Sequence, residues 1–241
     1  MLCQLHNVFP TMFLFLVGLA CLTLSVVVAD YQHGRDDLLY RVDIYLPPKE
    51  GRDEVADIQK IQQTVKGLTD IKVLFAFKEL GNARIVLVLD VEKPCSWPQL
   101  TGFLSRKGYV FNVTSLYLCT DFARELGITL NISMWSPSSG NDELAMLKKT
   151  VRVKGLATDE YNQMLKWNFE RDNIIFKSGQ PAVCFRTLAS YPVQLLYFGP
   201  ISQHDIEEVE EFVHASRCQT EVTRVADLDY YTRGAMDAAG I

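Results

Sequence analysis

The stretch LLYRVDIYLPP, from Leu38 to Pro48, alternates between apolar and polar side chains. A period of two is typical of a β-strand, because successive side chains of a strand point to opposite faces of the sheet. The two prolines at its end stop the pattern, since proline cannot donate a hydrogen bond to a strand ladder. The stretch therefore predicts a first strand over residues 38–46, whose apolar face consists of Tyr40, Val42, Ile44 and Leu46.

The next elements follow in a recognisable order. Residues 53–66 have the apolar spacing of a helix, and Gly67 follows as its expected end. Strands are predicted over 71–79 and 83–91, around the hairpin signal Gly81-Asn82. A helix over 96–106 and a strand over 109–119 complete the order β-α-β-β-α-β, which is that of a ferredoxin-like plait.

The second half of the chain predicts the same order again. It reads as a strand over 128–135, helices over 141–149 and 159–170, strands over 182–188 and 193–198, a helix over 202–214 and a strand over 220–226. An ungapped offset of 109 residues places Leu87 on Leu196 and Val113 on Val222, and an offset of 88 aligns the first strands. The difference predicts an insertion of about 21 residues, around 150–173.

We therefore predict an α+β chain of two tandem ferredoxin-like (βαββαβ) repeats that form a pseudo-dimeric α/β barrel. The first repeat covers residues 36–126, the second covers 127–233 and a tail covers 234–241. Two plaits in one chain resemble the dimeric α/β-barrel superfamily. The first half, with LLYRVDIYLPP, a helix and ARIVLVLDV, is similar to muconolactone isomerase. This resemblance implies an isomerase- or cyclase-like enzyme that acts on a small molecule between the sheets, although no catalytic motif of that family carries over.

The first 29 residues contain no Lys, Arg, Asp or Glu. Val27 and Ala29 precede Asp30 in a pattern of small residues that is typical of signal-peptide cleavage. We expect a signal peptide over 1–29 and a secreted, extracellular protein. The apolar run could also span a bilayer, which takes about 20 residues, so an uncleaved anchor in the secretory pathway is the alternative.

Cysteine usage fits export, because an even number of cysteines remains after Ala29. These are Cys95, Cys119, Cys184 and Cys218. The expected disulfides are 95–119 and 184–218, and the alternative is four buried thiols. No C-x-x-C or Cys/His spacing indicates zinc, so neither a metal nor a cofactor is predicted.

Polar residues on the first strand form the candidate binding site. Arg41, Asp43 and Tyr45 lie on the face away from the predicted helices, and Asn131 lies on the aligned face of the second repeat. If the two sheets face each other, these side chains line a polar cavity in which Asp43 could act as a base. The favoured alternative is an ordinary solvated strand face.

Two N-x-[ST] sequons, at Asn112 and Asn131, are glycosylation candidates. A sugar on Asn131 and a closed cavity around it exclude one another, because glycosylation requires an exposed side chain.

The bulk sequence excludes several function classes. A net charge of −5 argues against nucleic-acid binding, which usually needs a basic surface. The chain has no nucleophile elbow, H-E-x-x-H, P-loop or G-x-G-x-x-G. We predict a non-catalytic role in small-molecule binding or interaction. The alternatives are the isomerase- or cyclase-like enzyme and a single-pass, membrane-anchored luminal protein.

Overall fold

The computed structural model describes residues 38–48, 50–130, 144–175, 182–202, 207 and 218–239, all within the unit Leu38–Ile241. Eight strands and five α-helices lie in these residues. In chain order they are β1 (Leu39–Tyr45), α2 (Glu54–Lys66), β2 (Ile71–Glu79), β3 (Arg84–Val91), α3 (Trp97–Arg106), β4 (Val110–Leu118), α4 (Cys119–Glu125), β5 (Leu144–Val151), α5 (Thr158–Ile175), β6 (Val183–Thr187), β7 (Val193–Gly199), β8 (Cys218–Asp227) and α7 (Leu228–Ala239).

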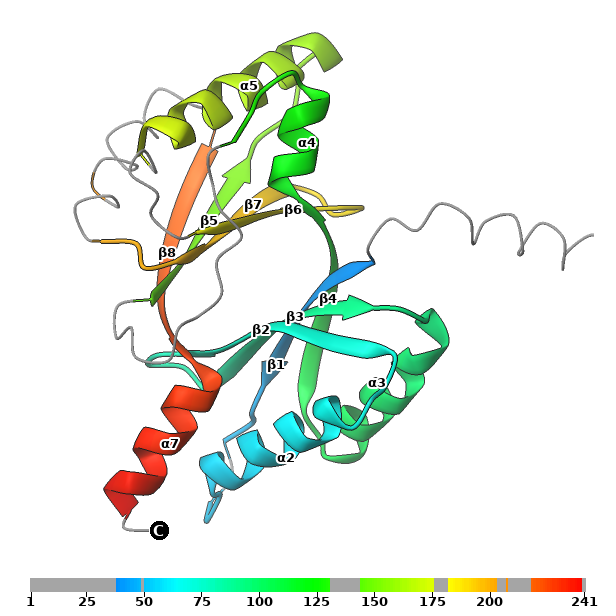
Figure 1. Cartoon of the computed structure of the whole chain (residues 1–241), viewed down its shortest axis with the longest axis vertical. Helices are drawn as coiled ribbons and strands as arrows, with labels where there is room; N and C mark the ends of the chain where they lie inside the picture. The colour runs from blue at the N-terminus through cyan, green and yellow to red at the C-terminus, as the bar shows by residue number, and fades with distance from the viewer. Residues whose placement is uncertain are drawn as a thin grey trace, which may run out of the picture. The chain divides into compact units, whose positions relative to one another are not determined.

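The strands form a closed antiparallel barrel in the order β1-β3-β2-β8-β5-β7-β6-β4 (Figure 1). The first four strands are neighbours in the order β4-β1-β3-β2, and the last four in the order β8-β5-β7-β6. Two short seams join these groups. Phe77–Glu79 of β2 pair with Val225–Asp227 of β8, and Leu116–Leu118 of β4 pair with Phe185–Thr187 of β6. The predicted α+β barrel is therefore confirmed.

Local signals account for many of the elements. Asp53 accepts the N–H of Ala56 at 3.0 Å and so caps α2, whose Ile58 and Ile61 are buried. The hairpin between β2 and β3 turns at Gly81, where φ is +85°, a conformation that glycine adopts without strain. These boundaries match the predicted helix and hairpin.

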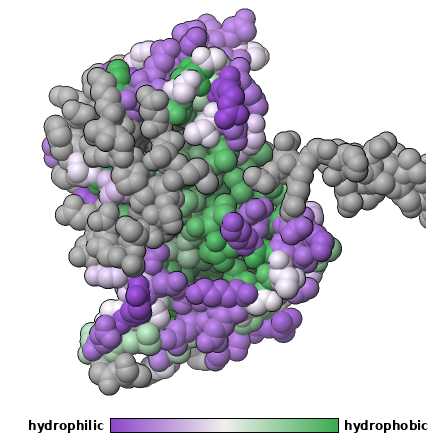
Figure 2. All heavy atoms as spheres, in the orientation of Figure 1, coloured by the Kyte–Doolittle hydropathy of each residue, from purple (hydrophilic) through white to green (hydrophobic). Residues whose placement is uncertain are grey.

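The inner face of the barrel is packed with apolar side chains. Aromatic rings meet across it: Phe77 and Phe198 are stacked at 5.1 Å between centroids, and Phe75 and Phe185 pack edge to face at 6.0 Å. An eight-stranded barrel has an interior just wide enough for side chains to fill. Figure 2 shows a hydrophobic area in the middle of one face, between mainly hydrophilic regions.

The outer faces of the strands carry the helices. Val42, Ile44 and Leu87 pack with Ile61 of α2, and Leu147 and Tyr197 pack with Phe169 of α5. Val42 and Ile44 come from the face that the alternation in LLYRVDIYL marks as apolar. The prediction of the two faces of β1 is confirmed.

The second half begins differently from the prediction. Residues 128–130 are not in a strand, and 131–135 lie outside the described residues. The helix predicted over 141–149 is wrong, because Leu144–Val151 form β5. β5 pairs with β7 and β8 as β1 pairs with β3 and β4. The prediction aligned residues 128–135 with the first strand and from that alignment inferred an insertion of about 21 residues. In the structure, β5 takes the place of the first strand in the second half.

Among the described helices, none is long and apolar enough to cross a membrane.

Candidate functional site

Arg41 and Asp43 project from β1 toward the barrel interior. They lie on the same strand face as Leu39, which packs in the inner core, while Val42 and Ile44 face the helices. Arg41 donates two hydrogen bonds to Asp43 Oδ1, from Nε at 3.1 Å and from Nη2 at 2.8 Å. The exposed fractions are only 8% for Arg41 and 3% for Asp43, so a solvated face does not describe these two residues.

Tyr45 is the last residue of β1, lies on the same strand face as Arg41 and Asp43, and is 41% exposed. The guanidinium of Arg84 on β3 lies 5.9 Å from its ring centroid. Arg84 also forms an ion pair with Glu79 of β2 and lies 4.0 Å from Asp43. Arg41, Asp43 and Tyr45 thus belong to one charged cluster, whose positive and negative groups are paired with one another.

The two sequon asparagines fall in different situations. Asn112 is exposed on β4, where it is paired across the ladder with Asp43 of β1. Asn131 lies outside the described residues. Exposure of Asn112 is compatible with glycosylation, which needs an accessible side chain.

The predicted disulfide pairing is wrong. Cys119 is bonded to Cys184, with 5.3 Å between the Cα atoms. The seam between β4 and β6 brings them together, because Leu118 pairs with Phe185 in the ladder. Cys95 is exposed and forms no disulfide within the described residues, and the buried Cys218 donates its S–H to Asn168 Oδ1 at 3.8 Å.

A second polar cluster is buried between the second half of the barrel and α5. Asp172, which is fully buried, accepts hydrogen bonds from Lys149 of β5 and from the hydroxyl of Tyr197 of β7. Burial and the neighbouring carboxylate of Asp172 raise the pKa of Tyr197 well above its usual value. These groups satisfy one another and are closed to solvent, which fits a role in fixing α5 on the sheet.

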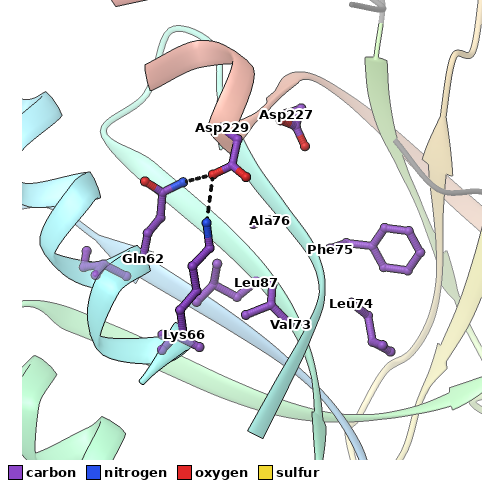
Figure 3. Close-up of a pocket in the computed structure, with 11 residues that line it drawn as sticks. Gln62, Lys66, Val73, Leu74, Phe75, Ala76, Leu87, Asp227 and Asp229 are labelled. Atoms are coloured by element: carbon purple, nitrogen blue, oxygen red, sulfur yellow. Dashed lines mark hydrogen bonds and ion pairs between the residues drawn. The ribbon is translucent and has the colours of Figure 1, made fainter. Parts of the chain in front are cut away.

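A pocket of about 260 Å³ opens on the other half, between α2, β2 and the start of α7 (Figure 3). Its floor is apolar, with Ile61, Val65 and Leu87 buried in the outer core. A register shift between Val73 and Phe75 interrupts the β2–β3 ladder at the pocket wall. The lining residues are Ile61, Gln62, Val65, Lys66, Val73, Leu74, Phe75, Ala76, Leu87, Asp227 and Asp229.

The charged groups of the pocket gather at its rim. Gln62 donates a hydrogen bond to Asp229 at 2.5 Å, and Lys66 lies 3.5 Å from the same carboxylate oxygen. Asp227 caps α7 by accepting the N–H of Tyr230 at 2.9 Å. An apolar floor with a few polar groups at the mouth is the usual make-up of a ligand site. In the described part of the chain, no group of three or more His, Cys, Asp or Glu residues could hold a metal ion.

Sequence reasoning missed this pocket. The available signal was Asp227-Leu228-Asp229, in which an acidic residue precedes an amphipathic run and so indicates a helix start. That signal predicts α7, but it does not place Asp229 against α2, because Gln62 and Asp229 are far apart along the chain.

No protein-family model and no curated protein sequence matches the chain. Solved structures do match its fold. Chlorite dismutase from Candidatus Nitrospira defluvii in complex with imidazole is 10% identical, with a TM-score of 0.54 over 83% of this chain and 96% of that chain. A single-residue mutant of the same enzyme is also 10% identical and has a TM-score of 0.56 over the same shares.

A third structure comes from Fusobacterium nucleatum and is provisionally assigned as a monooxygenase. It is 9% identical, with a TM-score of 0.49 over 81% of this chain and 94% of that chain, which is too low to support an argument. At these identities the matches show the fold alone, an α+β barrel similar to that of chlorite dismutase. The finer resemblance to muconolactone isomerase is not confirmed.

Proposed function

We propose that this chain is an exported binding protein that holds a small, mainly apolar molecule in the pocket between α2, β2 and α7. The observation that carries the proposal is the pocket itself, with buried Ile61 and Val65 at its floor and Asp229 at its rim. Its volume, about 260 Å³, is slightly below the range of about 300–1,000 Å³ typical of drug-sized ligands, so its occupant is small.

Methyl NMR of the mature chain tests this proposal, with n-hexanol as the probe. The expected result is saturable shifts of the methyl groups of Val65, Val73, Leu74 and Ala76. Shifts confined to Val88 and Leu196, which lie in the inner core of the barrel, would place the binding site elsewhere. If no methyl signal shifts at a high concentration of n-hexanol, the proposed function is contradicted.

The architecture of the proposed protein is two tandem ferredoxin-like repeats. The strand orders β4-β1-β3-β2 and β8-β5-β7-β6 support it, because each is the plait order 4-1-3-2. The location is extracellular, after removal of residues 1–29, with sugars on Asn112 and Asn131. N-terminal sequencing of exported material should begin at Asp30, whereas a full-length chain in membranes would indicate the anchor.

The second candidate function is catalysis on a small molecule at Arg41, Asp43 and Tyr45. It is favoured by the likeness of the barrel to that of chlorite dismutase, which is an enzyme. The burial of Asp43 among two arginines gives it an environment unlike that of a surface carboxylate. Isomerisation of an unsaturated lactone by the purified chain, abolished in Asp43→Asn, would favour this candidate. A chain without turnover would leave the binding role.

A further inference from the structure

The β2–β8 seam is shorter than strand β2. β8 pairs with β2 only over Phe77–Glu79 and gives way to α7 at Leu228. Earlier in β2, Val73 and Ala76 pair with Leu89 and Leu87 of β3, and no described strand is paired with them on the side of β8. Such a strand edge presents N–H and C=O groups in the plane of the sheet, where another strand can pair with them.

The pocket lies at this edge. Val73 and Ala76 pack against the outer core under α2, whereas Leu74 packs against the inner core of the barrel. All three line the pocket, so the pocket reaches both faces of β2 around its edge. The register shift between Val73 and Phe75 is a β-bulge or irregularity, a feature common at sheet edges and beside binding sites.

The charges at the rim favour a cationic partner. Among the described residues that line the pocket, Asp227 and Asp229 are acidic and Lys66 is the only basic one. Lys66 and Asp229 are each more than half exposed, at 63% and 61% of the side chain, so water screens their ion pair. The rim therefore carries an excess of one negative charge and an exchangeable salt bridge.

Resting on the pocket proposed above as a binding site, we infer that the small apolar group it holds is a side chain of an extended peptide segment. The segment pairs with β2 in the antiparallel sense, beside the part of β2 that precedes Phe77 and that β8 does not reach, since β8 ends at Asp227. It places one apolar side chain in the pocket and one Lys or Arg beside Asp227 and Asp229. Backbone pairing at a sheet edge gives affinity in this mode, and the pocket gives specificity.

A peptide accounts for two features of the pocket, its strand edge and its volume, better than a free small molecule does. At Val73 and Ala76, β2 has no described strand partner on the side of β8, and an extended chain can pair there in strand register. The pocket volume also suits a single side chain better than a drug-sized molecule.

The test uses the mature chain and a blocked, fluorescent hexapeptide, Thr-Val-Leu-Lys-Val-Thr, followed by anisotropy. Two matched versions carry N-methyl groups on alternate residues, one on each edge of the extended peptide. We expect one version to lose at least about tenfold in affinity and the other to bind like the parent, because only one edge pairs with β2. Equal affinity of both versions with the parent would overturn strand addition.

Hydrogen exchange and a charge variant complete the test. Bound peptide should slow amide exchange within residues 73–76, and unchanged exchange there at saturation would overturn the inference. Asp229→Asn keeps an acceptor for Gln62 and should weaken the peptide several-fold, whereas Asp237→Asn, an exposed control on α7, should not. If n-hexanol binds the pocket and the peptide does not, this inference fails and the proposed function stands. If neither binds, both fail.

Discussion

Cys119, the first residue of α4, is covalently joined to Cys184 in β6, across the seam that closes the barrel between β4 and β6. The two residues are 65 positions apart, and both are buried. The bond reinforces a seam that has only three paired residues on each strand. It therefore ties the first half of the barrel to the second at one of the two short seams that join them.

Replacing both residues, as Cys119→Ala with Cys184→Ala, should lower the free energy of unfolding by about 2–5 kcal/mol, because the unfolded chain gains the freedom that the cross-link removes. Urea denaturation measures the change. Cys95→Ala is the matched control, since Cys95 is exposed, and it should shift stability by less than about 0.5 kcal/mol. Non-reducing peptide mapping that linked Cys95 to Cys119, or Cys184 to Cys218, would contradict the structure.

The ion pair between Arg41 and Asp43 gives a second prediction. Asp43→Ala should cost about 3–5 kcal/mol, because it leaves the buried Arg41 guanidinium without its main partner. The double variant Arg41→Met with Asp43→Val should be more stable than Asp43→Ala, since it removes both charges. Chemical denaturation of each variant measures both changes in unfolding free energy. A cost below about 1 kcal/mol for Asp43→Ala, which is typical of a surface pair, would show that the cluster is open to water.

Stability at alkaline pH depends on Tyr109. Burial and its hydrogen bond to Asp57, at 2.7 Å, raise the pKa of Tyr109 from 10.0 to about 12. The folded state therefore keeps this proton after the unfolded chain has lost it. The contribution to stability is fully present below pH 10 and is lost as the pH rises through about 12.

Tyr109→Phe should thus make the loss of unfolding free energy between pH 10 and pH 12 less steep, as measured by urea denaturation at several pH values. Tyr191→Phe, at a residue that is 76% exposed, is the control and should leave the slope unchanged. An identical slope in Tyr109→Phe and the unmodified protein would mean that the hydroxyl does not hold its proton through Asp57.

The first half of the fold could be predicted closely because its signals are local. Asp53 and Gly67 mark the ends of α2, and Gly81 marks the hairpin. β5 was not predictable in the same way. Leu144 and Met146 pack inside the barrel while Ala145 and Leu147 pack under α5, so both faces are apolar and the alternation of a strand is lost. A short apolar run of this kind cannot be distinguished from a helix by its spacing.

The site depends on contacts that spacing cannot reveal. Alternation places Arg41 and Asp43 on the correct face of β1, but only closure of the barrel makes that face buried. Cysteine spacing does not show that β4 and β6 are neighbours, which is what joins Cys119 to Cys184. The pocket needs the end of the β2–β8 seam and the contact between Asp229 and Gln62, and both are long-range.

The most direct test of the central claim is the affinity of n-hexanol for the chain from residue 30 to 241 and for its Ala76→Phe variant. Ala76 lines the pocket, so a phenylalanine ring there should fill the space and reduce binding at least about tenfold. Ala238→Phe, on the exposed end of α7, is the matched control and should bind like the unmodified protein. Undiminished binding by a correctly folded Ala76→Phe variant would contradict the assignment of this pocket as the functional site.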